Sequence, residues 1–163
     1  MIEFVLKNRK LRLHPDGSMY VRAYRKNAET KTEKWIELRF HITANGYKQC
    51  GITVDSINMK FYEHRLIYYA NNQSWDIFNS SMDNCIDHYN RKKEDNRIEN
   101  LHVVTNQQNQ WNKDGKGYYW TKSRNKWQAS ITTNGKTKFL GYFVKEEDAR
   151  TAYLEAKGKY HIL

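Results

Sequence analysis

The sequence has little cysteine, a single proline and no long apolar run. Cys50 and Cys85 lie in unrelated segments and form no Cys-x-x-Cys pair, which argues against a disulfide framework and a cysteine zinc site. No apolar stretch approaches the roughly 18 to 20 residues that span a bilayer. We therefore expect a protein of the reducing cytoplasm without membrane association. Since no glycine- and serine-rich linker is visible, segment boundaries must come from changes in hydrophobic period.

Positive charge and aromatic side chains are abundant instead. The 163 residues include 28 Lys and Arg against 18 Asp and Glu, a formal net charge of +10, and 14% are aromatic. An excess of this size indicates a polyanionic partner. The aromatic content is too high for a disordered basic tail, so we expect a folded α+β protein.

Three segments follow from the hydrophobic pattern. Residues 1–60 carry short alternating stretches with turn signals at Pro15-Asp16-Gly17 and Asn45-Gly46, which predicts antiparallel strands. Residues 61–112 predict a helix near 62–70, strands at 85–88 and 101–104, and then a second helix. Its start is marked by Thr105-Asn106-Gln107-Gln108, the pattern of a capping box. The middle segment is therefore a strand, loop, strand and helix unit.

Residues 113–163 form the third and most basic segment per residue. Alternation at 117–122, 126–132 and 136–143, with the hairpin signal Asn134-Gly135, predicts a three-stranded antiparallel sheet. A helical spacing of apolar residues within 145–160 predicts one helix packed on a face of this sheet. Alternation also predicts that Trp127, Ala129 and Ile131 face the helix, while Gln128, Ser130 and Thr132 face outward.

One carboxylate, one imidazole and several amides occur together in the middle segment. Asp87 offers a hard oxygen ligand, and an Asn carbonyl of the following helix offers a second. His88 leaves the strand on the side opposite to Asp87, and its imidazole can deprotonate water near neutral pH. This set suits phosphodiester cleavage with a divalent cation. The histidines could also indicate zinc, but the better-spaced carboxylate and amide favour a harder ion.

The middle segment resembles the HNH endonucleases with a ββα-metal fold, of the homing type found in phages and introns. The resemblance rests on His64-Arg65-Leu66, Ile86-Asp87-His88, Asn96-Arg97-Ile98-Glu99-Asn100-Leu101, Val104-Thr105 and Asn109. It implies that Asp87 and Asn109 bind Mg²⁺ or another divalent cation such as Mn²⁺, and that His88 is the general base. Asn100 would brace the loop between the strands and so orient His88.

Basic residues around this set have two interpretations. His64 could contact a phosphate or anchor its helix, and we favour the structural role. Arg91, Lys92 and Lys93 lie in the loop beside the set, where they could contact phosphates or form a solvated surface.

The third segment resembles the Apetala/ethylene-response-factor DNA-binding domain. The resemblance rests on Lys116-Gly117-Tyr118-Tyr119, Lys126-Trp127-Gln128-Ala129, Leu140-Gly141-Tyr142-Phe143 and residues 146–153. It implies a sheet that lies in the major groove of DNA. The side chains that it places on or near the DNA-facing side are Lys116, Tyr119, Arg124, Ser130, Thr132, Lys138 and Phe139.

The sequence as a whole thus predicts a metal-dependent DNA endonuclease with a nuclease core at 61–112 and a DNA-binding domain at 113–163. We expect double-stranded DNA as the partner, a monomer or homodimer, and action in the cytoplasm, with a phage gene in a bacterial host as one origin. The first segment supports the core or, through Arg22, Arg25 and Lys26, extends the DNA surface. The alternatives are a catalytically inactive DNA-binding regulator and a structure-specific or RNA-directed nuclease.

Overall fold

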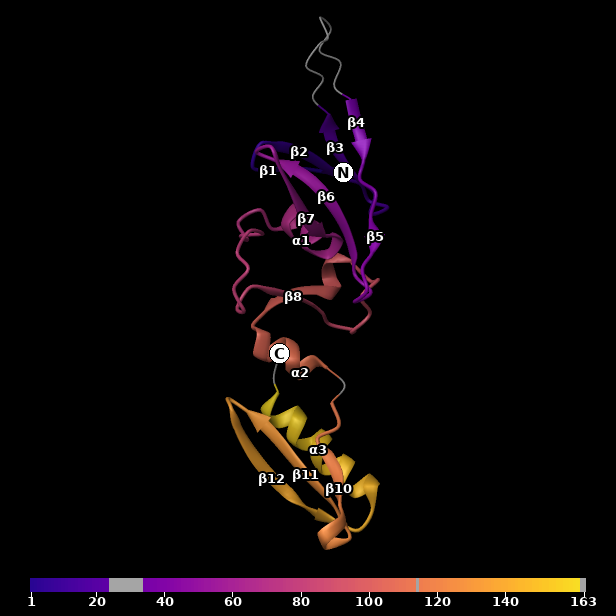
Figure 1. Cartoon of the computed structure of the whole chain (residues 1–163), viewed down its shortest axis with the longest axis vertical. Helices are drawn as coiled ribbons and strands as arrows, with labels where there is room; N and C mark the ends of the chain where they lie inside the picture. The colour runs from indigo at the N-terminus through magenta and orange to yellow at the C-terminus, as the bar shows by residue number, and fades with distance from the viewer. Residues whose placement is uncertain (24–33, 114, 162–163) are drawn as a thin grey trace, which may run out of the picture. The chain divides into compact units, whose positions relative to one another are not determined.

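The computed structural model describes residues 1–23, 34–113 and 115–161, so Arg25 and Lys26 lie outside the described residues. Helices and antiparallel sheets are both present, which confirms the α+β class (Figure 1). The chain forms two compact units, Met1–Val103 and Val104–Leu163. The domain boundaries predicted after residues 60 and 112 stay predictions. No helix in the described parts of the chain is long and apolar enough to cross a membrane.

The first unit begins with two antiparallel sheets, as the alternation in residues 1–60 predicts. The strands β1, β2, β3 and β4 pair in that order, and β5, β6 and β7 form the second sheet. A two-residue turn joins β6 to β7, with positive φ at Asp55 (48°) and Ser56 (67°), the geometry that matches strand twist. The bounds are β1 Ile2–Leu6, β2 Arg9–Leu13, β3 Met19–Ala23, β4 Lys34–Glu37, β5 His41–Ile42, β6 Lys48–Val54 and β7 Ile57–Tyr62.

One hydrophobic core joins these sheets to the rest of the unit. Phe4 and Leu6 are buried while Val5 between them is exposed, so β1 turns one side inward. The same core includes Leu66 of the helix α1 (Glu63–Asn71) and Leu101 far along the chain. The first segment therefore supports the structure that follows it.

The loop after α1 is held by one guanidinium group. Arg65 donates from Nη1 to the carbonyl oxygen of Asn84 (3.1 Å) and from Nη2 to that of Ile77 (3.0 Å), and it lies 4.6 Å from the ring centroid of Trp75. Asn84 is itself buried and donates to the carbonyl oxygens of residues 76 and 79. These contacts fix the approach to the next strand.

The predicted strands and helix of the middle segment are present. β8 (Cys85–His88) pairs with β9 (Leu101–Val104), which follows the 3-10 turn η1 (Ile98–Asn100). The helix α2 (Asn106–Asn112) begins with a complete capping box: Thr105 Oγ1 accepts from Gln108 N, and the Gln108 side chain accepts from Thr105 N. The order strand, strand, helix is confirmed.

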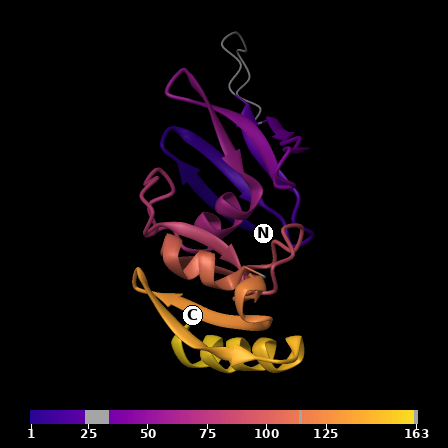
Figure 2. The same ribbon diagram turned by 60° about the horizontal axis from the view of Figure 1, so that its bottom comes forward.

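The second unit contains the predicted three-stranded sheet and its helix. The strand order is β10-β11-β12, and α3 runs along one face of the sheet (Figure 2). Ala129 and Ile131 are 0% and 2% exposed, as predicted for side chains facing the helix, and Trp127 is half-buried. The bounds are β10 Tyr118–Thr121, η2 Lys122–Arg124, β11 Lys126–Thr133, β12 Lys136–Phe143 and α3 Glu146–Tyr160.

Small residues let the helix and sheet approach closely in this unit. Ala149 and Ala156 of α3 are buried. A Cβ atom at Gly117 would lie 2.0 Å from the ring of Tyr153, so only glycine fits there. The Asn134-Gly135 turn has positive φ at both residues (50° and 70°), which confirms the predicted hairpin.

Candidate active site and nucleic-acid interface

Strand β8 carries Asp87 and His88 on its last two residues. Side chains alternate along a strand, and Ile86 and His88 are buried whereas Cys85 and Asp87 are half-buried. His88 is only 3% exposed. The two side chains therefore leave the strand on different sides, as the alternation predicts.

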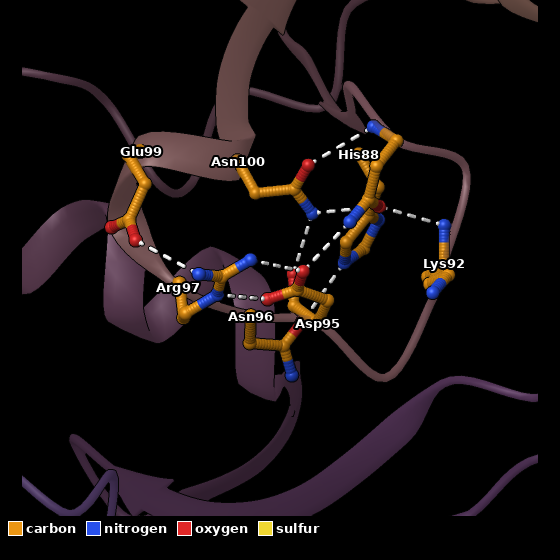
Figure 3. Close-up of polar contacts among 8 residues, drawn as sticks. His88, Lys92, Asp95, Asn96, Arg97, Glu99 and Asn100 are labelled. Carbon is orange, nitrogen blue, oxygen red and sulfur yellow. Dashed lines mark hydrogen bonds and ion pairs between the residues drawn. The ribbon is translucent and has the colours of Figure 1, made fainter.

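Asn100 holds the loop that follows His88 (Figure 3). Its Oδ1 accepts from the backbone N–H of Asn90 (3.0 Å), and its Nδ2 donates to Asn90 Oδ1 (3.0 Å) and to the carbonyl oxygen of Asp95 (2.7 Å). Its own carbonyl oxygen accepts from Tyr89 N–H (2.9 Å). Because this buried amide is bonded in all these directions, it determines the path of the chain from 89 to 95.

Asp95 and Arg97 close the outer side of the same loop. The guanidinium of Arg97 donates from Nε and Nη2 to the two carboxylate oxygens of Asp95, both at 2.8 Å (Figure 3). These hydrogen bonds are the main cause that holds the pKa of Asp95 well below its usual range. The Arg97 side chain is 68% exposed, so the pair shapes the loop more than it stabilises the fold.

The imidazole of His88 is bonded to a chain of buried polar groups. His88 Nε2 lies 2.8 Å from Asn96 Oδ1, and Asn96 Nδ2 donates to Glu63 Oε2 (2.5 Å). Glu63 Oε2 lies 3.4 Å from Lys48 Nζ. Sequence reasoning missed Glu63 and Lys48 because both lie far from His88 in the sequence. Asn96, eight residues after His88, is one of the amides of the middle segment, but the sequence assigns it no role.

Aromatic rings surround His88 and His64. The ring centroid of His64 lies 5.2 Å from the centroids of His88 and Tyr47. The His64 ring also stacks on the ring of Tyr62, with centroids 5.5 Å apart. Burial, followed by the charges of His88 and Arg65, lowers the pKa of His64 to about 3. His64 is therefore a neutral buried imidazole at neutral pH, a state that suits a structural role.

Asp87 is the carboxylate with which a metal site would begin. In the parts of the chain that the structure describes, no three His, Cys, Asp or Glu side chains are gathered as a metal cluster. Burial, and then the charge of Asp87, raise the pKa of Tyr47. The carboxylate of Asp87 is a hard oxygen ligand of the kind that fits Mg²⁺ or Mn²⁺, which accept water and substrate oxygens as further ligands. A structural zinc site would need four protein ligands.

Asn109, the second predicted ligand, lies on α2 in the second unit. Its side chain is half-buried, and its backbone N–H donates to the carbonyl oxygen of Thr105 (3.0 Å). The capping box thus fixes the turn of helix that carries it.

The basic residues of the 89–95 loop are exposed, as both interpretations of them require. Arg91 adopts a left-handed conformation (φ 62°), and its N–H donates to the carbonyl oxygen of His88 (2.9 Å). Lys92 N–H donates to Asn90 Oδ1 (2.9 Å). Lys93 Nζ donates to the carbonyl oxygen of Asn45 (2.8 Å) and lies 4.8 Å from the Tyr47 ring centroid.

The sheet of the second unit has an open face rich in aromatic rings. Tyr119, Gln128 and Tyr142 are directly opposite one another across the strands. A bulge opposite Ala129 and Ser130 turns Phe139 to the same face, where its ring lies 4.9 Å from Tyr142. The exposed fractions of Tyr119 and Phe139 are 53% and 57%.

Arg124 and Lys138 lie differently with respect to this face. The guanidinium of Arg124 lies 4.8 Å from the Tyr142 ring centroid, on the open face. Lys138 is paired with buried Ile131, and its ammonium lies 4.2 Å from the ring of Tyr160 on α3. Lys138 therefore lies on the helix side of the sheet, because it precedes Phe139 directly in the strand.

The remaining predicted DNA contacts of the second unit are Lys116, Ser130 and Thr132, and they line one groove. Tyr119 also borders this groove, together with Gln107, Gln110 and Trp111 of α2. Trp111 stacks on His161, with ring centroids 4.7 Å apart and planes 6° from parallel.

The comparison with protein families bears on the middle of the chain. Residues 81–111 match the family described as HNH endonuclease. The match supports an HNH nuclease. It contains Asp87, His88, Asn100 and Asn109, so the buried imidazole on β8 and the loop that Asn100 braces lie within the matched stretch. The chain matches no curated protein and no solved structure.

Proposed function

We propose that the protein is a metal-dependent DNA endonuclease of the HNH class and of the homing type, encoded by a phage and acting in the bacterial cytoplasm. The observation that carries this proposal is the imidazole of His88. It sits at the end of β8 inside the HNH-matching stretch, is bonded through Nε2, and is followed by a loop that Asn100 braces.

In this reaction His88 acts as the general base. It accepts a proton from water, whose oxygen attacks the phosphorus while the bond to the 3′ oxygen breaks. The products carry a 5′-phosphate and a 3′-hydroxyl. Asn100 acts indirectly, since its hydrogen bonds set the loop that begins after His88.

Asp87 and Asn109 would hold the divalent cation, Mg²⁺ or Mn²⁺. When bound, the cation supplies positive charge to the scissile phosphate and to the departing oxygen. The exposed side chains of Arg91, Lys92 and Lys93 would contact neighbouring phosphates.

The open face of the β10–β12 sheet binds double-stranded DNA in this proposal, as its resemblance to the Apetala/ethylene-response-factor domain implies. Exposed Tyr119, Phe139 and Arg124 are available there. Ser130 and Thr132 also point outward by alternation, whereas Lys138 contributes charge from the other side. A monomer has one catalytic centre and nicks one strand; a homodimer would cut both.

Supercoiled plasmid and host DNA test the activity directly. We expect nicked or linear products with Mg²⁺, loss of cutting in chelator, and loss of cutting by His88→Ala. His41→Ala, which removes an exposed histidine of β5, serves as the matched control. Binding in a mobility-shift assay without cutting of any DNA would instead support the inactive regulator.

A further inference from the structure

We propose that Asn96 and Glu63 are positioning residues that fix the tautomer of His88, with the proton on Nε2 and the lone pair on Nδ1. The catalytic consequence rests on the proposed nuclease function: Nδ1 is then the atom that receives the proton from water. The tautomer itself can be tested without any activity.

The orientation of the Asn96 amide decides the argument. Glu63 presents a carboxylate oxygen to this amide at 2.5 Å, and a carboxylate only accepts hydrogen bonds. The amide must therefore direct Nδ2 toward Glu63, because the flipped orientation would bring two oxygens together. Its Oδ1 then faces His88 Nε2 at 2.8 Å and can only accept.

It follows that His88 Nε2 must donate. A neutral imidazole carries one N–H, so the proton on Nε2 leaves Nδ1 as the basic nitrogen. Reversing the tautomer would place two acceptors against each other at a buried position. Such an unsatisfied contact disfavours the reversed form, since buried acceptors have no water to compensate them.

We call the hydrogen-bonded series His88, Asn96 and Glu63 the relay. Burial and charge hold its side chains in place. His88, Asn96 and Glu63 are 3%, 9% and 8% exposed. Glu63 is the first residue of α1, where the helix dipole favours a carboxylate, and Lys48 Nζ lies 3.4 Å from the same oxygen that Asn96 binds. The four groups come from β6, α1, the 95–97 segment and β8.

Nitrogen-15 NMR of the histidine rings measures the tautomer. The full chain is labelled with ¹⁵N-histidine and observed without DNA or metal at about pH 8.5, above the usual histidine pKa. His88→Ala identifies the His88 signals, and exposed His41 reports a ring that exchanges freely between tautomers. We expect the two ring nitrogens of His88 to have widely separated chemical shifts, with the protonated shift at Nε2.

Two variants test the relay. Asn96→Leu removes the acceptor, and Glu63→Leu leaves the Asn96 amide free to rotate. In both variants, the chemical shifts of the His88 ring nitrogens should move toward the averaged values of His41. Asn84→Leu removes another buried amide of the same unit, bonded around residues 75–79, and should leave the His88 pattern unchanged.

The outcomes are distinct. A wild-type His88 protonated on Nδ1, or averaged like His41, overturns the proposal even if no variant folds. An unchanged pattern in folded Asn96→Leu overturns it too. In cleavage assays we expect Asn96→Leu to lower kcat by roughly tenfold or more with DNA affinity unchanged. If the wild type cuts no DNA, the nuclease proposal fails, while the ring nitrogens still decide the relay.

Discussion

Two sets of candidate functional residues differ in burial: His88 and Asn100 of the first unit are buried, whereas the rings and the cation on the open face of the second unit's sheet are exposed. His88 and Asn100 are 3% and 6% exposed, and hydrogen bonds fix their positions. Tyr119 and Phe139 are more than half exposed, on the open face of a sheet. Buried, bonded groups set geometry, which a chemical step requires, while an exposed face supplies contact area and charge for binding.

This contrast predicts that changes at His88 and Asn100 alter rates and stability, and that changes on the open face of the β10–β12 sheet alter affinity. The largest effect should come from His88→Ala. We expect the single-turnover rate of DNA cleavage to fall by about 10² to 10⁴, because a general base contributes that much. The dissociation constant for DNA, measured by fluorescence anisotropy, should stay within about a factor of two of the wild-type value. Equal losses of rate and affinity would contradict the separation of roles.

Asn100→Leu should produce the next largest effect, on stability. The substitution leaves the N–H of Asn90 and the carbonyl oxygen of Asp95 without their buried partner. We expect the free energy of unfolding of the first unit to fall by about 1 to 3 kcal/mol. Chemical denaturation measures the loss, and amide hydrogen exchange should quicken at Asn90. Asn58→Leu, at an exposed position of β7, is the comparison. A loss of equal size there would show that Asn100 has no special role in the loop.

The lowered pKa of His64 predicts a smaller effect, on the pH dependence of the free energy of unfolding. This pKa is lowered to about 3 by burial, followed by the charges of His88 and Arg65. At pH values between about 3 and the unfolded pKa near 6.5, the unfolded chain binds the proton more readily than the folded chain does. The contribution of His64 to the free energy of unfolding is therefore fully present above about pH 6.5 and is lost as the pH drops. One proton corresponds to about 1.4 kcal/mol per pH unit.

The measurement compares His64→Phe with the wild type. Denaturation at pH 7.5 and at pH 5 should show a loss on acidification that is smaller in the variant by on the order of 2 kcal/mol. Identical losses would mean that folding does not lower the pKa of His64.

Local patterns allowed much of the fold to be predicted. The strands at 85–88 and 101–104 and the capping box at Thr105 depend on neighbours in the sequence, so the prediction and the structure agree. The bond between Asn96 and Glu63 joins residues 33 positions apart. Only the packing of α1 against the later loop creates it, and no period or spacing in the sequence encodes that contact.

The open face of the second unit shows the same limit on a smaller scale. Adjacent Lys138 and Phe139 cannot both face outward from one strand, yet the resemblance to the Apetala/ethylene-response-factor domain places both on or near the DNA-facing side. The bulge beside Gly141, which has a φ of 144°, places Phe139 with Tyr142 and leaves Lys138 on the helix side. A one-residue change of register has no local signal strong enough to be seen beforehand.

The smallest predicted effect concerns the two cations on either side of this sheet. If the open face binds DNA, Arg124→Ala should weaken binding by roughly three- to tenfold and lower the slope of log affinity against log salt by about 0.9, one phosphate contact. Lys138→Ala should change the slope less, because its ammonium lies over the ring of Tyr160 on the opposite side. The cleavage rate at saturating protein should be unchanged in both variants. Anisotropy titrations across a salt series measure both slopes, and a larger slope change for Lys138→Ala would mean that DNA lies on the helix side of the sheet.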